Sequence, residues 1–272
     1  QALGAEQTIY CPAFPENGRT IFMGNLFVGQ QPLSESPMKD HPLTPMQDSN
    51  LARLLDAQTK RATGLADRLV VARWAAALSA HLEARKTSGV AHVITDAVAD
   101  SDLEIITQSC WNMPLLTGGS ALAMSLPQHY QQAGYITQTA HDRSIPELSP
   151  SALILSGSCS EMTRRQVSAY TGPSYKLDAL EIAHNGLDAA RTWLSEQDLS
   201  DAPLIYATSS PEEVKQIQQK LGAEAAGELI EQALSSLAVR GFEMGVRRFV
   251  IAGGETSGAV AKALDIDNLL IG

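Results

Sequence analysis

Short apolar runs alternate with longer segments of helix-forming residues along most of the chain. The apolar runs predict buried strands, and their alternation with helices predicts largely parallel sheets flanked by helices, an α/β fold. The predicted strands cover residues 8–14, 90–95, 113–117, 151–156, 203–208 and 249–251. The predicted helices include residues 72–86, 224–244 and 259–264, with others beginning near residues 50, 101, 119, 160 and 211.

Polar residues mark several of the expected helix starts. Ser101 with Glu104 has the spacing of a capping box, in which each residue bonds the backbone N–H of the other. Ser209 or Ser210 is expected to cap a helix whose first position is Pro211. These caps indicate where loops end and helices begin.

The first half also contains irregular structure. Residues 19–29 hold two apolar stretches joined by Gly24-Asn25, which predicts a two-residue hairpin turn. Residues 30–49 contain four prolines and no periodicity, and they predict a long loop. His41 in this loop would either contact a substrate or only hold the loop.

A polar segment at 139–150 separates two α/β halves. We place the domain boundary there, which gives domains at 1–146 and 147–272. The chain begins with Gln1 and ends directly after the apolar "NLLIG", so we expect a piece of a longer protein that lacks part of each domain.

Composition narrows the class of protein. Of the 272 residues, 44% are hydrophobic and 18% charged, which suits a soluble two-domain protein. A net charge of -10 does not favour nucleic acid, and neither a membrane span nor a secretory signal is visible. Three widely spaced cysteines fit a cytoplasmic protein. A homo-oligomer is compatible with these features.

Three strand-to-helix joints consist almost entirely of small residues. Each would place free backbone N–H groups and the positive end of a helix dipole at the carboxyl edge of a sheet, where ligands bind. The joints lie at Thr117–Ser120, Ser156–Ser160 and Gly253–Gly258. They match neither the Walker motif nor the dinucleotide GxGxxG motif, and a single Gly-Gly turn is often only a tight turn.

Nucleophilic catalysis is the rival interpretation of the second joint. Ser158 or Cys159 lies in a turn where a helix N-terminus lowers a thiol pKa. A base is required, and His184 is the only histidine of the second half. A buried, inert cysteine is the alternative.

Two charged residues of the first half are candidates for a substrate site. Asp96 ends a predicted strand, where a carboxylate contacts substrate or instead caps a loop. Arg19 has the guanidinium needed to bind a carboxylate with two hydrogen bonds, or it forms a surface pair with Glu16.

The order of several motifs resembles the four-carbon acid sugar kinase family from residue 8 to the end. The motifs are "CPAFPENGRTIFMGNLFVGQQPLSES", "HPLTPMQDSNL", "TDAV", "LLTGGSALA", "LSGSCSEMTRRQV" and "IAGGETSGAV". The likeness is greatest to members that act on 3-oxo-tetronate. It implies ATP-dependent phosphorylation of the terminal hydroxyl of an acid such as 3-oxo-tetronate, threonate or erythronate, in a cleft between a sugar-acid domain and a nucleotide-binding domain.

The resemblance also implies roles for individual residues. The expected nucleotide-binding residues are Ser156, Ser158, Ser160, Gly253, Gly254, Glu255 and Thr256. The expected sugar-acid residues are Arg19, Asp96, Gly118, Gly119 and Ser120. ATP brings Mg²⁺, for which no ligand residue is assigned.

Two motifs of the family are not matched in this chain. One is an N-terminal "ADDFTGA" that supplies a catalytic aspartate, and the other is a C-terminal "KSGNFG" that completes the nucleotide site. The catalytic base is therefore expected outside these residues. A hydrolase or acyl-transfer enzyme using Cys159 or Ser158, and a noncatalytic module that binds a small anion or nucleotide, are the alternatives.

Overall fold

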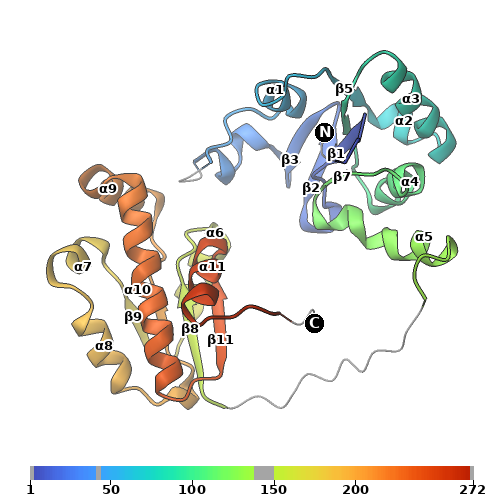
Figure 1. Cartoon of the computed structure of the whole chain (residues 1–272). Helices are drawn as coiled ribbons and strands as arrows, with labels where there is room; N and C mark the ends of the chain where they lie inside the picture. Colours follow the sequence, from blue (N-terminus) through green and yellow to red (C-terminus); the bar gives the residue numbers. More distant parts are fainter. Residues whose placement is uncertain (1–2, 41–43, 138–149, 270–272) are drawn as a thin grey trace. The chain divides into compact units, whose positions relative to one another are not determined.

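Each half of the chain is organised by a four-stranded parallel sheet (Figure 1). The computed structural model describes residues 3–40, 44–137 and 150–269, and the chain divides into two units, 1–141 and 142–272. The predicted α/β class with parallel sheets flanked by helices is confirmed. The predicted domain boundary at residue 146 lies outside the described residues.

The first sheet carries helices on both faces. Its strands, in spatial order, are β5 (Thr63–Ala66), β6 (His92–Thr95), β1 (Thr8–Cys11) and β7 (Leu116–Gly118). The helices of the unit are α1 (Leu51–Asp56), α2 (Arg68–Val71), α3 (Ala75–Thr87), α4 (Asp100–Cys110) and α5 (Leu126–Gln132). Short 3-10 helices cover 15–17, 33–35, 37–40 and 120–125.

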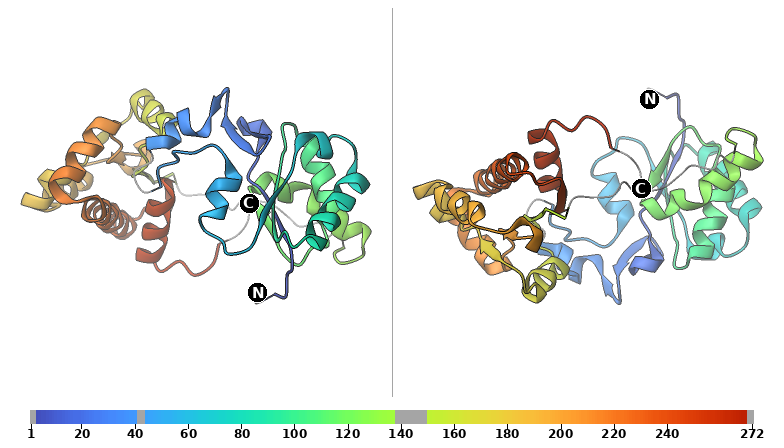
Figure 2. Two further views of the ribbon diagram at one scale, coloured as in Figure 1. Left: turned by 90° about the horizontal axis from the view of Figure 1, so that it is seen from above. Right: turned by 90° about the horizontal axis from the view of Figure 1, so that it is seen from below.

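Side chains point alternately to the two faces of the first sheet, and each face is covered by different helices. Ile9 and Val93 point to the same fully buried face, where they share a core with leucines and isoleucines of α3 and α4. Tyr10 and Ile94 point to the opposite face, where they line a cavity of about 250 Å³ with leucines of α1. Figure 2 shows α1 on one side of these strands and α3 and α4 on the other.

A small antiparallel sheet follows the first strand. It consists of β2 (Arg19–Phe22), β3 (Asn25–Val28) and β4 (Gln31–Pro32). Phe22 pairs with Asn25, so the two turn residues are Met23 and Gly24, one position before the predicted Gly24-Asn25. Both have positive φ, 49° and 74°, the signature of a type I′ turn.

Asp96 holds this turn in place. Its fully buried carboxylate accepts the backbone N–H groups of Met23 (2.6 Å), Gly24 (2.9 Å) and Arg68 (2.9 Å). Burial raises the pKa of Asp96, and the three N–H donors partly offset that effect. One side chain thus ties the hairpin and the start of α2 to the end of β6.

A second buried aspartate, in the first turn of α4, stabilises the start of that helix. Asp102 accepts the N–H groups of Val98 (2.8 Å) and Ala99 (3.1 Å), and it pairs with the Arg68 guanidinium at 3.0 Å. The predicted capping box of Ser101 with Glu104 is therefore wrong, because the helix starts at Asp100.

The second unit has the strand order β11-β8-β10-β9. Its strands are β8 (Ala152–Ser156), β9 (Ser174–Lys176), β10 (Leu204–Tyr206) and β11 (Arg248–Ala252). Its helices are α6 (Glu161–Ala169), α7 (Ala179–Asn185), α8 (Asp188–Ser195), α9 (Pro211–Leu221), α10 (Ala223–Glu243) and α11 (Gly254–Ala263), with a 3-10 turn at 199–201. Leu153 and Leu155 of β8 share its core with Leu234 and Leu237 of α10.

Sequence predicted some boundaries well and others poorly. Ser210 caps α9 in a capping box with Glu213, as expected. The helix predicted at 72–86 is two helices, α2 and α3, separated at 72–74. The strand predicted at 113–117 begins only at Leu116, beyond Pro114, which has no N–H to donate to a sheet. Of the helices in the described residues, none is long and apolar enough to cross a lipid bilayer.

We expect Asp96→Asn to destabilise the chain by about 1–3 kcal/mol, because the new NH₂ group faces backbone donors that need an acceptor. Urea denaturation measures the change. Asp56→Asn, at an exposed aspartate of the same unit, is the control and should stay within about 0.5 kcal/mol of the parent. Equal stability of the two variants would show that the Asp96 carboxylate does not hold the hairpin.

Candidate functional site

Three strands of the second sheet end at the same level. Tyr206 of β10 and Ala252 of β11 both pair with Ser156, the last residue of β8. Each strand then leads through a short loop into a helix, namely α9, α11 and α6. This carboxyl edge is where open α/β sheets bind ligands.

The helix after β11 begins earlier than the sequence predicted. It starts at Gly254 instead of Ala259, so Glu255 and Thr256 belong to its first turn. The N–H groups of Gly254, Glu255 and Thr256 donate no hydrogen bond to any described residue. A methyl group added at Gly254 would meet no atom within 4 Å. The first turn therefore offers open space beside three free donors, as an anion requires.

The other glycines of these joints serve loop packing. The N–H groups of Gly157 and Ser158 both donate to the carbonyl of Ala252, at 3.0 and 3.1 Å. A side chain at Gly157 would collide with the Thr256 hydroxyl. Gly253 adopts φ 125°, a region that L side chains rarely enter. The two joints are thus pressed together, and only glycine allows it.

The hydroxyl groups of the second joint bond to two threonines outside it, Thr163 of α6 and Thr208 after β10. Ser160 caps α6 by accepting the Thr163 N–H at 3.1 Å. The Thr163 hydroxyl lies 2.9 Å from that of Ser160 and 3.0 Å from that of Ser158. Ser156 is buried, and its Oγ lies 2.7 Å from Oγ1 of Thr208. These serines shape the loop.

Thr208 belongs to the hydrogen-bonded network of this candidate site, and it was not predicted from the sequence. It follows β10, and its Oγ1 donates to the Ser158 carbonyl at 2.8 Å. The neighbouring Ser209 and Ser210 were predicted only as helix caps, and Ser210 is the cap of α9. The available signal was that residues 207–210 form a further strand-to-helix joint with a hydroxyl group at the same edge.

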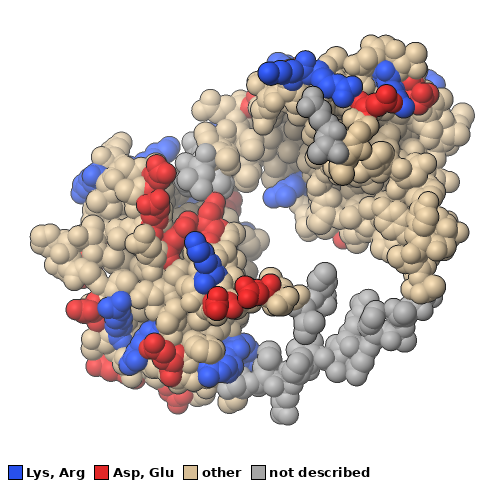
Figure 3. Space-filling view, viewed as in Figure 1, with Lys and Arg blue, Asp and Glu red and all other residues tan. Residues whose placement is uncertain are grey.

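Side-chain capping distinguishes the three helix N-termini, all of which carry an acidic residue in the first turn. That of α9 is closed by Glu213, whose carboxylate accepts the Ser210 N–H at 3.1 Å. The first turns of α6 and α11 carry the exposed Glu161 and Glu255, and α11 has no side-chain cap. On the face shown in Figure 3, acidic and basic side chains are interspersed over the second unit, with no continuous basic surface for a polyanion.

The cysteines differ in exposure. Burial raises the pKa of Cys11 to about 11 and that of Cys110 to about 12, so both stay protonated at neutral pH. Cys159 is half-buried, and its thiol lies 3.9 Å from the carbonyl of Gly157 in its own loop.

In the first unit, the predicted glycines lie at the carboxyl edge of the sheet. A side chain at Gly118 would come within 2.5 Å of the Cys11 carbonyl, and the Gly119 N–H donates to that same carbonyl at 3.0 Å. Ser120 is exposed and begins a 3-10 helix. Gly118 and Gly119 thus pack against the end of β1, and Ser120 is left facing outward.

The other two predicted residues are connected through the hairpin. Arg19 is the exposed first residue of β2, and no ion pair joins it to a described residue, Glu16 included. Asp96 is buried under the turn of the same hairpin. The structure therefore leaves Arg19 available to an anion and uses Asp96 to hold the element that carries it.

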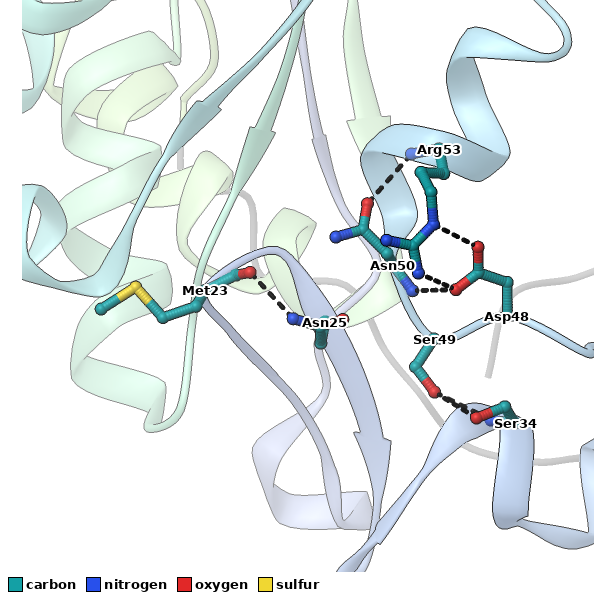
Figure 4. Close-up of polar contacts among 7 residues, drawn as sticks. All are labelled: Met23, Asn25, Ser34, Asp48, Ser49, Asn50 and Arg53. Carbon is teal, nitrogen blue, oxygen red and sulfur yellow. Dashed lines mark hydrogen bonds and ion pairs between the residues drawn. The ribbon is translucent and has the colours of Figure 1, made fainter.

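A polar cluster fixes the loop after the hairpin. In Figure 4 the Arg53 guanidinium faces the Asp48 carboxylate, with contacts of 2.6 and 2.7 Å. This pairing lowers the pKa of Asp48 to about 2. Asn50 caps α1, and the hydroxyls of Ser34 and Ser49 lie 2.9 Å apart. His41 lies outside the described residues.

The comparisons with known proteins match both halves. A family model described as a sugar-binding N-terminal domain matches residues 1–126, and one described as a nucleotide-binding C-terminal domain matches residues 153–272. The chain is 45% identical to a 3-oxo-tetronate kinase of Burkholderia multivorans and 46% identical to one of Pseudomonas fluorescens. Each alignment covers 100% of this chain and 64% of the relative, so the chain spans about two-thirds of their length.

Two solved structures are also similar. A Salmonella typhimurium LT2 protein, solved under the provisional name of a tRNA synthase, is 36% identical with a TM-score of 0.73. A Haemophilus influenzae protein is 37% identical with a TM-score of 0.60. In both cases the match covers 97% of this chain and 64% of the other.

We expect Gly157→Ala to lower stability by about 1–3 kcal/mol, because the methyl group displaces Thr256 from the contact between the joints. In a Thr256→Ala background the same change should cost at least about 1 kcal/mol less. Urea denaturation of the four chains of this double-mutant cycle measures the coupling. Gly227→Ala, where a methyl group meets no atom within 4 Å, is the additive control, and additivity at Gly157 as well would contradict the account.

Proposed function

Because the chain belongs to the four-carbon acid sugar kinase family, we propose that it forms the sugar-acid and nucleotide-binding parts of an ATP-dependent kinase. The kinase phosphorylates the terminal (4-) hydroxyl of an acid such as 3-oxo-tetronate, threonate or erythronate. The observation that carries the proposal is the open first turn of α11, with three free N–H groups at the carboxyl edge of the second sheet.

The nucleotide's phosphates would bind at the ends of α6 and α11. Gly254, Glu255 and Thr256 supply the free N–H groups, and Gly253 gives the loop its turn. The serines at 156, 158 and 160 fix the shape of the neighbouring loop through bonds to Thr208 and to the first turn of α6. Phosphate oxygens fit this set because the donors are backbone N–H groups at helix N-termini.

Mg²⁺ would be held mainly by the nucleotide. The described residues contain no cluster of three or more acidic, histidine or cysteine side chains that could hold a metal ion. Mg²⁺ commonly takes phosphate oxygens, water and one or two carboxylates. Glu255, exposed in the first turn of α11, is the carboxylate nearest in sequence to the proposed phosphate site.

The sugar acid would bind to the first unit. Arg19 is proposed to bind its carboxylate, because a guanidinium matches a carboxylate with two parallel hydrogen bonds. Asp96 supports that contact by fixing the hairpin. Gly118 and Gly119 have no side chain and so leave space at the edge of the sheet, and Ser120 next to them has an exposed hydroxyl.

Phosphoryl transfer relies on positioning and charge neutralisation more than on covalent catalysis. This chain's residues would orient the phosphates from the second unit and the acid from the first. The chain supplies no residue to which we assign the catalytic base.

The alternatives fit less well. An acyl-transfer enzyme would need a base that accepts a proton from Cys159 or Ser158. The Ser158 hydroxyl instead accepts a hydrogen bond from Thr163, and the curated relatives are kinases. A noncatalytic anion-binding module would share the site but leaves the sugar-binding half without a role. We also propose a cytoplasmic location, in keeping with three free cysteines. A homo-oligomer is compatible with this function, and the oligomeric state is to be measured in solution.

We expect Gly254→Val to weaken Mg-ADP binding by at least about 100-fold, because a branched side chain would fill the space beside the free N–H groups. Isothermal titration calorimetry on the 272-residue chain measures this. Gly258→Val, at an exposed glycine one turn further along α11, adds the same side chain to the same helix and should bind like the parent. Equal binding by both variants would place the phosphates elsewhere, and no binding by the parent would refute the nucleotide site.

We expect Arg19→Ala to weaken binding of threonate or erythronate by about 10- to 100-fold, the usual effect of losing a charge-assisted hydrogen bond. Mg-ADP affinity should not change. Arg73→Ala removes another exposed arginine of the first unit and serves as the control. Unchanged acid affinity in Arg19→Ala would remove Arg19 from the site.

A further inference from the structure

Thr208 joins the loop after β10 to the loop after β8. It is 6% exposed, and its Oγ1 lies 2.7 Å from the Ser156 Oγ and 2.8 Å from the Ser158 carbonyl oxygen. A carbonyl only accepts hydrogen bonds, so Thr208 must donate its single proton there. Ser156 must then donate its own proton to Thr208, and that proton is not available to a ligand.

This chain of bonds fixes the direction of one backbone donor. The described peptide bonds are trans, so the N–H of Cys159 points opposite to the Ser158 carbonyl within the same peptide plane. With that carbonyl held by Thr208, the Cys159 N–H is turned away from Thr208. The direction of the Cys159 donor is therefore set by the Thr208 hydroxyl.

The Cys159 N–H is also the free donor of its loop. The N–H groups of Gly157 and Ser158 donate to Ala252, and that of Ser160 reaches the Ser158 hydroxyl at 3.3 Å. Within the described part of the chain, no bond occupies the N–H of Cys159. A ligand that binds at this loop thus has one preset backbone donor available before α6 begins.

We propose that Thr208 is a positioning residue for nucleotide binding, which aims the Cys159 N–H at a phosphate oxygen of a nucleoside di- or triphosphate. The inference rests on the proposed function, because it assigns a role within the same site. Thr208 itself touches no phosphate in this account. Its own joint is closed to anions by Glu213, whose carboxylate caps α9, and it acts by holding the loop after β8.

The test removes the hydroxyl and keeps the shape. We expect Thr208→Val to weaken Mg-ADP binding by about 10- to 100-fold, the effect of losing one well-aimed hydrogen bond to a charged group. Thr208→Ser keeps the hydroxyl and should bind within about threefold of the parent. Isothermal titration calorimetry gives the affinities, and urea denaturation shows that each variant is folded.

A matched control separates positioning from stability. Thr107 of the first unit is also buried, and its hydroxyl donates to the Leu122 carbonyl at 3.1 Å. Thr107→Val should lower stability and leave Mg-ADP affinity unchanged. A folded Thr208→Val that binds like the parent would overturn the inference, as would equal weakening by Thr208→Val and Thr208→Ser. Absence of Mg-ADP binding by the parent would instead refute the proposed function itself.

Discussion

The carbonyl of Ala252 is the acceptor on which the second unit's functional edge depends. It receives the N–H groups of Gly157 and Ser158 and so joins the ends of two neighbouring strands. That junction is close enough that a side chain at Gly157 would strike Thr256. Because these N–H groups are satisfied inside the protein, the free donors that remain in the two joints include those at the start of α11, at Cys159 and in the first turn of α6. The packing of two loops thereby decides where an anion can bind.

The first unit uses a buried carboxylate for the same purpose. Asp96 gathers three backbone N–H groups from the hairpin and α2, and so places Arg19 without contacting it. In both units, then, groups that sequence suggests as ligand contacts also build the scaffold. A strand end offers unpaired polar groups, and the fold satisfies most of them before a ligand takes the remainder.

Sequence patterns predicted the α/β class, the two parallel sheets and most of the strands, because burial imposes a regular spacing on apolar residues. The Ser210 cap was predictable because it is a local interaction: its partner Glu213 is only three residues away. Contacts between distant segments were not predictable. Asp96 meets Met23 across 73 positions, and Ser156 meets Thr208 across 52. The early start of α11 at Gly254 was hidden because glycine is a weak helix former.

The most direct test of the central claim is the amide spectrum of the ¹⁵N-labelled chain with and without Mg-ADP. We predict that the largest changes fall on the N–H groups of Gly254, Glu255 and Thr256, while those of Gly157 and Ser158, already bonded to Ala252, change less. A spectrum that does not respond to Mg-ADP, or responds only in the first unit, would contradict the claim that this edge binds the nucleotide's phosphates.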